Sequence, residues 1–361
     1  MGVAARPVDR YPASVRHRPE LDGLRGIAIL LVLFEHAGVP GFATGGTTGV
    51  TLFFVLSGYL ITSLLLIEIE ASGRIDLIAF YMRRALRLLP ALYAVLLVVA
   101  VFLLLGLWPK EALTGTNYAV VFVSVIFYAA NWVWIAGNYL NLLGHTWSLA
   151  VEEQFYIIWP VTLFVGLKLG RRRLALVLIL VGLAVTPWRE YLVIHGDVAH
   201  AMAGLDTHAD ALLLGCAVAL VVPKYSAIVG WLGVVGVLLL ATAWQFEPNR
   251  VFGQLMFVPL VTVAGTVAVA ACPAALGWRP LAFIGKISYG LYLWHGIIIW
   301  YHAPWPITVA VSLVVAVLSW YVIERPFLAL KGRFARTASG RAAAQRLAAG
   351  VPSLEAVPPG A

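Results

Sequence analysis

Long apolar runs dominate this chain and recur along nearly its whole length. Eleven hydrophobic segments, each bounded by polar or basic residues, lie at about 24–40, 47–68, 90–107, 116–135, 147–167, 174–188, 209–223, 227–243, 254–273, 287–302 and 306–323. A run of about 20 mainly apolar residues has the length of a helix that crosses the hydrocarbon core of a bilayer. The pattern therefore predicts an all-α polytopic membrane protein embedded in the lipid bilayer.

The distribution of basic residues predicts the direction of each crossing. Five arginines lie in residues 1–25, and residues 331–346 carry one lysine and four arginines, so the positive-inside rule predicts that both termini are cytoplasmic. Two cytoplasmic ends require an even number of crossings, and the segment 116–135, rich in Asn, Trp and Tyr, is the one that does not fit. If it dips into the membrane and returns, the basic cluster 168–173 joins Arg74 on the inner side. We predict about ten transmembrane helices plus one re-entrant or interfacial segment, with Arg189 among the few basic residues outside.

Composition agrees with this class and narrows the partners. The chain is 61% hydrophobic and 12% charged, whereas a soluble domain averages about 25% charged residues. The net charge of +8 is explained by topology, so no nucleic-acid partner is expected. Residues 1–20 are predicted to be a basic cytoplasmic arm without a cleavage site, 21–330 the transmembrane domain of a plasma-membrane protein, and 331–361 a basic, disordered cytoplasmic tail. Cys216 and Cys272 lie in apolar runs and are expected to act as small hydrophobic residues, and no pattern indicates an oligomeric state.

The first hydrophobic segment carries two ionisable residues, in "LDGLRGIAILLVLFEHAG". Arg25 and His36 are eleven residues apart, which places them on nearly one helix face and about 16 Å apart along the axis. Arg25 is expected near the cytoplasmic boundary and could be only a topological anchor. A histidine this far along an apolar helix more often lines a functional cavity, so His36 is the stronger candidate for chemistry.

An arginine cluster follows the second segment, in "FYMRRALRLLPALY". Arg83, Arg84 and Arg87 are three and four residues apart, which clusters their guanidinium groups on a short predicted helix. Guanidinium groups match phosphate oxygens in bidentate geometry, although anchoring to lipid headgroups would explain the same cluster.

A further group of polar residues interrupts the stretch "GHTWSLAVEEQFYIIWP". His145, Ser148 and Glu152 lie along one helical stripe, whereas Glu153 lies on the neighbouring stripe. With this helix running from outside inward, His145 and Ser148 are expected at the outer mouth. Glu152 is then about 10 Å deeper, at the predicted depth of His36.

Three smaller polar insertions remain, and each alone is more typical of a structural role. "DTHADALLLGC" places His208 and Asp210 at the outer start of an inward helix, and "GKISYGLYLWHG" places Tyr292 and His295 near one face of an outward helix. "SWYVIERPF" ends the last segment with Glu324 at the inner boundary.

Taken together, these stretches resemble the acyltransferase-3 family of integral membrane acyltransferases, which acylate hydroxyls of sugars and sugar-containing compounds. The matching motifs are "ELDGLRGIAILLVLFEH", "FFVLSGYLI", "RRALRLLP", "HTWSLAVEEQFYIIWP", "DALLLGC", "SYGLYLWH" and "ERP", in the family's order over residues 20 to 327. Each motif is weak alone, but seven in order are specific. The resemblance implies an acyl-CoA donor, by default acetyl-CoA, with Arg25 and His36 as paired essential residues and the Arg83, Arg84 and Arg87 loop near the CoA. The chain departs from the family at His208, where arginine is usual, and the extra hydrolase-like domain of some members is not expected.

The predicted chemistry is acyl transfer from a thioester to an alcohol, which needs a base and stabilisation of a tetrahedral oxyanion. His36 is expected to be the general base, or alternatively a covalent acyl carrier, and Glu152 or Glu153 to orient it. The acceptor would enter past His145, Ser148 and Asp210. It could be an envelope polysaccharide, a lipid-linked sugar or a glycosylated metabolite.

Two other classes of protein are consistent with part of the pattern. A multi-pass transporter with an intramembrane His/Glu relay explains the buried ionisable residues but not the arginine cluster. A glycosyl- or phosphotransferase on lipid-linked substrates would ordinarily carry acidic metal-binding clusters, and none is evident, so no metal is expected.

Overall fold

The structure is a computed structural model that describes residues 18–221, 226–242 and 250–330, and these residues are all helical or loop, without a β-strand. The predicted tail at 331–361 and nearly all of the predicted arm at 1–20 lie outside them. The longer helices are Pro19–His36 (α1), Gly45–Ser72 (α2), Leu77–Leu104 (α3), Trp147–Gly166 (α7), Arg171–Ile194 (α8), Leu205–Val221 (α10), Ala227–Thr242 (α11), Arg250–Ala270 (α12), Ser288–Ile298 (α14) and Trp305–Ser319 (α15). The shorter ones are Lys110–Leu113 (α4), Tyr118–Ile126 (α5), Ala130–Ile135 (α6), Val198–Ala203 (α9), Arg279–Lys286 (α13) and Arg325–Ala329 (α16).

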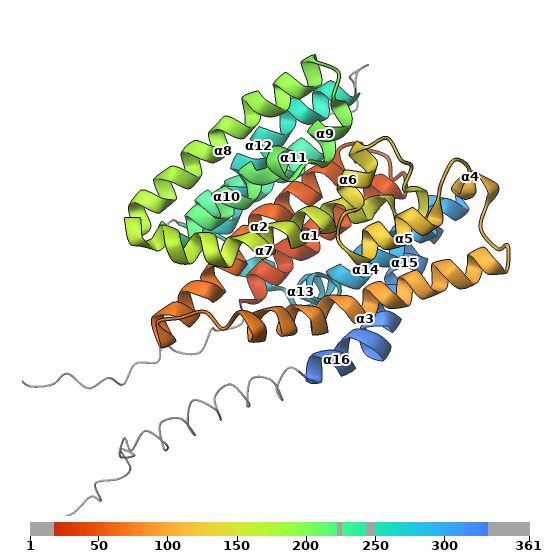
Figure 1. The fold of residues 1–361 in the computed structure, drawn as a ribbon, viewed down its shortest axis with the longest axis horizontal. Coiled ribbons are helices and arrows are strands. Elements are labelled where there is room, and N and C mark those ends of the chain that lie inside the picture. The colour runs from red at the N-terminus through yellow and green to blue at the C-terminus, as the bar shows by residue number, and fades with distance from the viewer. Residues whose placement is uncertain (1–17, 222–225, 243–249, 331–361) are drawn as a thin grey trace, which may run out of the picture.

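Helix α2 lies at the centre of the bundle (Figure 1). It packs against α1, α10 and α12, while α8 packs on α10 and α11 on α12. On the other side, α14 contacts α1, α3 and α15, and α13 lies along α1. The first helix is thus held between two groups of helices, which fixes the position of His36 at its C-terminal end.

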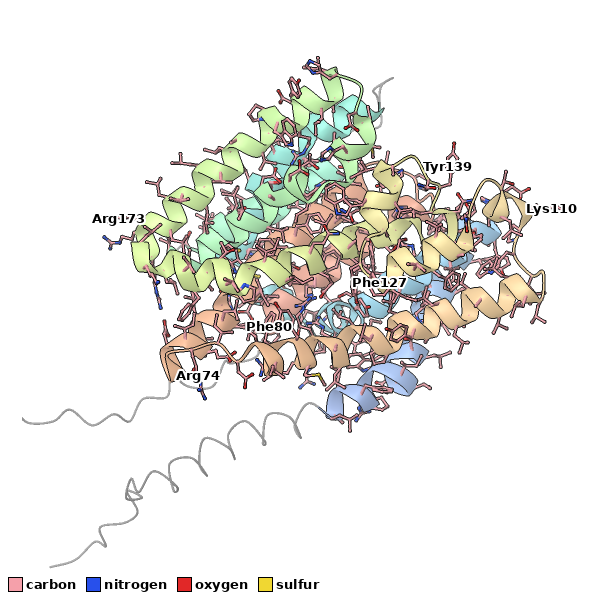
Figure 2. All side chains as sticks on the ribbon, in the orientation of Figure 1. Arg74, Phe80, Lys110, Phe127, Tyr139 and Arg173 are labelled. Atoms are coloured by element: carbon pink, nitrogen blue, oxygen red, sulfur yellow. The ribbon has the colours of Figure 1, made fainter. Side chains whose placement is uncertain are left out.

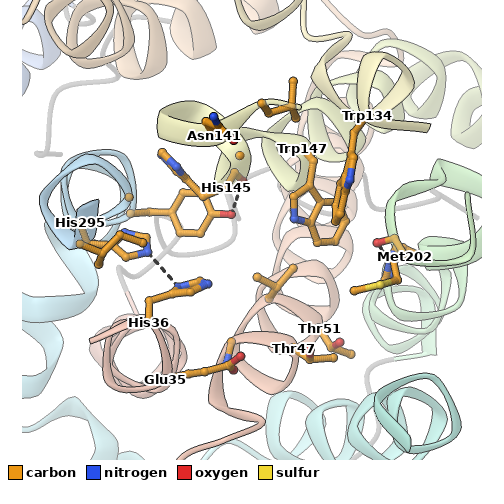
Figure 3. A pocket seen from close by; sticks show the side chains of 18 of the residues that line it. Glu35, His36, Thr47, Thr51, Trp134, Asn141, His145, Trp147, Met202 and His295 are labelled. Atoms are coloured by element: carbon orange, nitrogen blue, oxygen red, sulfur yellow. Dashed lines mark hydrogen bonds between the residues drawn. The ribbon is translucent and has the colours of Figure 1, made fainter. Parts of the chain in front are cut away.

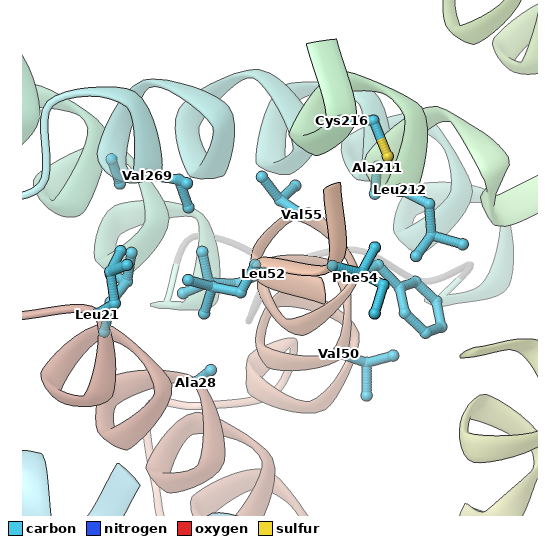
Figure 4. Packing of buried hydrophobic residues seen from close by; sticks show 14 of the residues in the cluster. Leu21, Ala28, Val50, Leu52, Phe54, Val55, Ala211, Leu212, Cys216 and Val269 are labelled. Atoms are coloured by element: carbon cyan, nitrogen blue, oxygen red, sulfur yellow. The ribbon is translucent and has the colours of Figure 1, made fainter. Parts of the chain in front are cut away.

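The hydrophobic core lies where α2 packs against its neighbouring helices. The outer surface of the bundle is also largely apolar. Leu52 and Phe54 of α2 are almost fully buried. Phe54 lies beside Leu212 of α10, whereas Leu52 points toward α12 (Figure 4). Large apolar side chains elsewhere on α3, α7 and α8 are exposed, as expected for helix faces that meet lipid. Cys216 is buried and its thiol donates to the carbonyl of Gly58, which confirms its small structural role.

Two glycines allow α2 and α10 to pack backbone against backbone. A Cβ atom on Gly215 would lie under 3.0 Å from the carbonyl oxygen of Val55, and one on Gly58 equally close to that of Leu212. Small residues at such contacts let membrane helices approach closely enough for extensive van der Waals packing.

We therefore expect Gly215→Ala to lower the free energy of unfolding by about 1–3 kcal/mol, because backbone atoms cannot move aside as a flexible side chain could. Gly182→Ala is the matched control: its new Cβ would sit 3.6 Å from the nearest atom, an ordinary contact. Thermal unfolding in detergent measures both. Equal transition temperatures for the two variants would contradict this packing.

Several helices have the length and composition of membrane crossings. By length and composition, five helices of the described residues could cross a membrane, or six if the bent pair Arg279–Lys286 and Ser288–Tyr301 is one span. α1 and α7, with 18 and 20 residues, are also nearly long enough to cross a membrane. They are not among these five helices and carry charged residues of the site. The segment 116–135 forms α5 and α6, each too short to cross alone. Ten crossings and a re-entrant 116–135 therefore remain predictions.

Two basic loops lie at the same end of the molecule. Arg171 forms an ion pair with Glu70, which joins the loop before α8 to the end of α2. Figure 2 shows Arg74 and Arg173 at this end, called here the arginine end, with Lys110 and Tyr139 toward the other. The grouping of these loops agrees with the sequence. Arg189, however, is not in a loop: it is buried within α8, 1% exposed.

Candidate active site

A cavity of about 420 Å³ opens at the end of the molecule opposite the arginine end. Its lining comes from α1, α2, α6, α7, α9, α10, α12, α14 and the 3₁₀ turns Asn141–Thr146 (η1) and Ile299–Tyr301 (η4), with the loop before η1 (Figure 3). The polar and aromatic members are Glu35, His36, Thr47, Thr51, Trp134, Tyr139, Asn141, His145, Trp147, His208, Tyr292, His295 and Trp300. We call it the histidine cavity.

His36 is hydrogen-bonded to a second histidine, His295. Nδ1 of His36 lies 3.1 Å from Nε2 of His295, and Nδ1 of His295 lies 3.1 Å from the carbonyl oxygen of Leu291. Because that carbonyl can only accept, His295 donates from Nδ1, and its Nε2, in the neutral ring, accepts a proton from Nδ1 of His36. The lone pair of His36 is therefore on Nε2, on the side of the ring away from His295 (Figure 3). This is the tautomer that a general base needs.

A third histidine, His145, lies beside His295. Their ring centroids are 5.5 Å apart, and the carbonyl of His145 accepts a hydrogen bond of 2.6 Å from the hydroxyl of Tyr292. A Cβ on Gly296 would collide with the His145 ring, so only glycine permits this contact. Burial, and then the nearby His36, lower the pKa of His145 to about 3, so its imidazole is neutral at pH 7. Its Nε2 is buried and has no hydrogen-bond partner among the described residues.

The predicted contact between His36 and a carboxylate of α7 is not found. Glu152 accepts a hydrogen bond of 2.6 Å from Ser57, and Glu153 forms an ion pair with Arg84. The depth inferred from the sequence was wrong by about two helical turns, since His145, seven residues before Glu152, is the residue level with His36. The reason is local: α1 ends at His36, and α7 begins only at Trp147.

The arginines lie around a smaller cavity deeper in the molecule. Arg25, Arg84 and Arg87 all line it, together with Glu152 and Glu153. The short predicted helix is in fact the first part of α3, which continues through Pro90. Arg83 differs from the others: it pairs with Glu68 at 3.3 Å and does not line this cavity.

A second small cavity lies between the cavity of the three arginines, called here the arginine cavity, and the histidine cavity. It is lined by Arg25 and Glu152, as the arginine cavity is, and by Tyr292, as the histidine cavity is, so the three cavities are adjacent. Ser148 lines it and is hydrogen-bonded to the Tyr292 hydroxyl at 2.6 Å. Arg25, in the N-terminal half of α1, and His36, at its C-terminal end, therefore border the same row of cavities.

Asp210 is not at the predicted acceptor entrance. Its carboxylate is buried and accepts a 2.7 Å hydrogen bond from Arg189, and it does not line the histidine cavity. The two residues His208 and Asp210 point to different sides of α10 because they are about 200° apart. His208 does line the cavity, and its Nε2 lies 2.9 Å from the carbonyl oxygen of Met202.

Among the described residues, no group of three or more His, Cys, Asp or Glu side chains could hold a metal ion.

Comparison with known proteins decides the family. The profile described as "Acyltransferase domain" of the acyltransferase-3 family matches residues 18–325, which include every residue of the three cavities. The chain belongs to this family. Its matched region is an acyltransferase domain, and the histidine and arginine cavities lie within it.

Curated relatives of this acyltransferase-3 chain are O-acetyltransferases by name. Peptidoglycan O-acetyltransferase OatA of Listeria monocytogenes is 35% identical over 87% of this chain and 56% of its own length. The putative peptidoglycan O-acetyltransferase YrhL of Bacillus subtilis is 36% identical over 88% of this chain and 56% of its own. A putative O-acetyltransferase of Staphylococcus aureus is 35% identical over 87% of this chain and 58% of its own length. The chain thus spans little more than half the length of these relatives, and no solved structure matches it.

Sequence reasoning missed the role of His295 and Tyr292. Both lie in "SYGLYLWH", one of the motifs that carry the family resemblance, but alone they look like interior residues of an apolar helix. The available signal was their spacing, since residues 292 and 295 are one turn apart and share a face.

Proposed function

We propose that this protein transfers an acyl group, by default acetyl, from acyl-CoA to a hydroxyl of a sugar-containing acceptor at a bacterial cell envelope. The observation that carries the proposal is the row of adjacent cavities that extends from three arginines to His36, whose lone pair is on Nε2. A thioester donor with an anionic nucleotide and a long thin arm has this distribution of charge and shape.

The proposed reaction uses His36 as a general base. Nε2 of His36 takes the proton of the acceptor hydroxyl as its oxygen attacks the thioester carbonyl. The tetrahedral intermediate then collapses, the C–S bond breaks, and the CoA thiolate takes that proton from the His36 imidazolium. His295 accepts the hydrogen bond from Nδ1 and holds the ring throughout, the orienting role predicted for Glu152 or Glu153.

His145 borders the reacting centre beside His295. Its neutral ring is hydrogen-bonded to the backbone carbonyl of Leu293, which can only accept, so the ring carries its proton on the nitrogen that faces this carbonyl. The buried Nε2, which has no hydrogen-bond partner among the described residues, therefore carries a lone pair and can accept a hydrogen bond from a hydroxyl of the acceptor. We therefore assign His145 to the acceptor side of the reacting centre.

The lining of the histidine cavity supports a sugar as acceptor. Trp134, Trp147 and Trp300 offer apolar ring faces, while Asn141 and Thr51 offer hydrogen-bonding groups. Relatives named as peptidoglycan O-acetyltransferases act on a sugar polymer, which agrees with this chemistry.

The donor assignment makes a direct prediction for Arg87. We expect Arg87→Gln to raise the KM for acetyl-CoA by about tenfold or more with little change in kcat, because a hydrogen bond to a charged group contributes about 1.5–3 kcal/mol. CoA release by the purified protein, followed with a thiol reagent, measures it.

Arg83→Gln is the matched control, since Arg83 pairs with Glu68 away from the cavity and its loss should leave the KM unchanged. Equal KM values for the Arg87 variant and the wild type would remove the arginine cavity from the donor site. Absence of CoA release with every acceptor would instead favour the transporter hypothesis.

A further inference from the structure

An apolar groove runs along the outside of the bundle. It has a volume of about 900 Å³ and lies between α7, α8 and α10. Its wall on α7 extends from Phe155 to Gly166, about 16 Å along the helix axis. Its polar groups gather near one end, where His200 and Asp206 lie, and the rest of the lining is almost entirely hydrocarbon. A groove of this shape matches a molecule with one apolar chain and one polar end.

The polar end of this groove is separated from the histidine cavity by a thin partition. Trp132 of α6 lines the groove, whereas Trp134 of the same helix lines the cavity. On α9, His200 faces the groove and Met202 the cavity. On α10, Ala209 lines the groove and His208 lines the cavity. The groove and the proposed site of transfer therefore lie back to back across single helices.

The chemistry of the polar end favours a sugar over a phosphate. Both oxygens of Asp206 are held, by Nε2 of His200 at 3.0 Å and by the indole N–H of Trp188 at 2.6 Å. The rings of Trp132 and Trp188 are 46% and 41% exposed. Exposed indoles beside a carboxylate suit the C–H faces and hydroxyl donors of a sugar, while a carboxylate repels an anionic headgroup.

We propose that the groove binds the hydrocarbon chain of an amphiphilic acceptor, in which the sugar to be acylated is attached to a lipid. The chain lies along α7 between α8 and α10, and the sugar passes over α6 and α9 into the histidine cavity. This inference rests on the proposed function and names its acceptor class: a lipid-linked sugar rather than a free one.

Photo-crosslinking tests the groove without any turnover. The probe is dodecyl β-N-acetylglucosaminide with a diazirine in the chain, used without donor on the purified full chain. We expect adducts on α7, α8 and α10, and a loss of at least about tenfold in Ala209→Phe, because the phenyl ring displaces more than two methylene groups from the groove. Ala184→Phe is the matched control, since Ala184 is exposed on α8 and does not line the groove.

CoA release with two acceptors tests the link to catalysis. The dodecyl glycoside should be acylated with a kcat/KM at least about tenfold above that of the methyl glycoside, and Ala209→Phe should abolish only this preference. Adducts elsewhere, equal loss in both variants, or displacement of the probe by a tenfold excess of phosphatidylglycerol would overturn the proposal. Equal kcat/KM values for the two glycosides would also overturn it. Expected adducts without CoA release from either glycoside would support the groove and count against the proposed function alone.

Discussion

Replacing His36 by alanine should lower kcat for acyl transfer by about 10²- to 10⁴-fold, the contribution of a well-placed general base. The loss follows from the tautomer fixed by His295, which leaves Nε2 of His36 as the proton acceptor facing the cavity. His36 is the last residue of α1 and the side chain lines a cavity, so the folded protein should persist. CoA release by the purified variant at saturating acetyl-CoA measures the effect.

His195→Ala is the control for this prediction, because His195 directly follows α8 and lines none of the cavities, and its Nδ1 lies 2.8 Å from the carbonyl oxygen of Tyr191. Its kcat should equal that of the wild type. A His36→Ala variant that keeps kcat within tenfold of the wild type would contradict the base mechanism. Trapping an acylated His36 in a quenched reaction would replace it by the covalent route.

Removing one partner of the Arg189–Asp210 pair should lower the free energy of unfolding by about 3–5 kcal/mol, because it leaves a buried charge uncompensated. The two side chains are 1% and 4% exposed and lie 2.7 Å apart, and Arg189 also donates to the carbonyl of Thr207. Denaturation of Arg189→Ala and Asp210→Ala in detergent measures the loss.

The exposed pair Arg171–Glu70 provides the control, because its side chains are 45% and 49% exposed. Such pairs contribute about 0–1 kcal/mol, so Arg171→Ala should change stability little. The double variant of Arg189 and Asp210 should be less destabilised than the sum of the single ones, since it leaves no unpaired charge. A fully additive double variant would contradict a direct pairing. The pair also concerns His208, which stands where arginine is usual in the family. In this chain the cation that pairs with Asp210 is Arg189 of α8.

Much of the fold was predictable from hydrophobic length alone. Within the residues that the structure describes, each of the eleven apolar runs corresponds to helical structure, because a run of that length can satisfy its backbone in lipid only as helix. The grouping of the loop 168–173 with Arg74 followed from charge, and the Arg171–Glu70 pair bears it out. Composition also identified His36 as exceptional, since few ionisable residues occur so far along an apolar run.

The contacts inside the site were not predictable, because they depend on where each helix begins and on how it is rotated. The end of α1 at His36 and the 3₁₀ turn before Trp147 shifted the depth of α7 by about two turns. Helical spacing predicted Glu152 near His36. In the structure Glu152 accepts a hydrogen bond from Ser57, and His36 is hydrogen-bonded to His295. The sequence analysis counted Arg189 as a loop charge. Its partner Asp210 is on another helix, and no pattern around Arg189 indicates that pairing.

The central claim is that a donor, which enters from the arginine end and binds in the arginine cavity, and an acceptor bound in the histidine cavity meet at His36. It is tested most directly in sealed vesicles holding the protein with its arginine end outward, with labelled acetyl-CoA added outside and the acceptor glycoside enclosed. We predict labelled acceptor inside, all CoA recovered outside, and neither product with His36→Ala. Labelling only when donor and acceptor share one side of the membrane would contradict the claim.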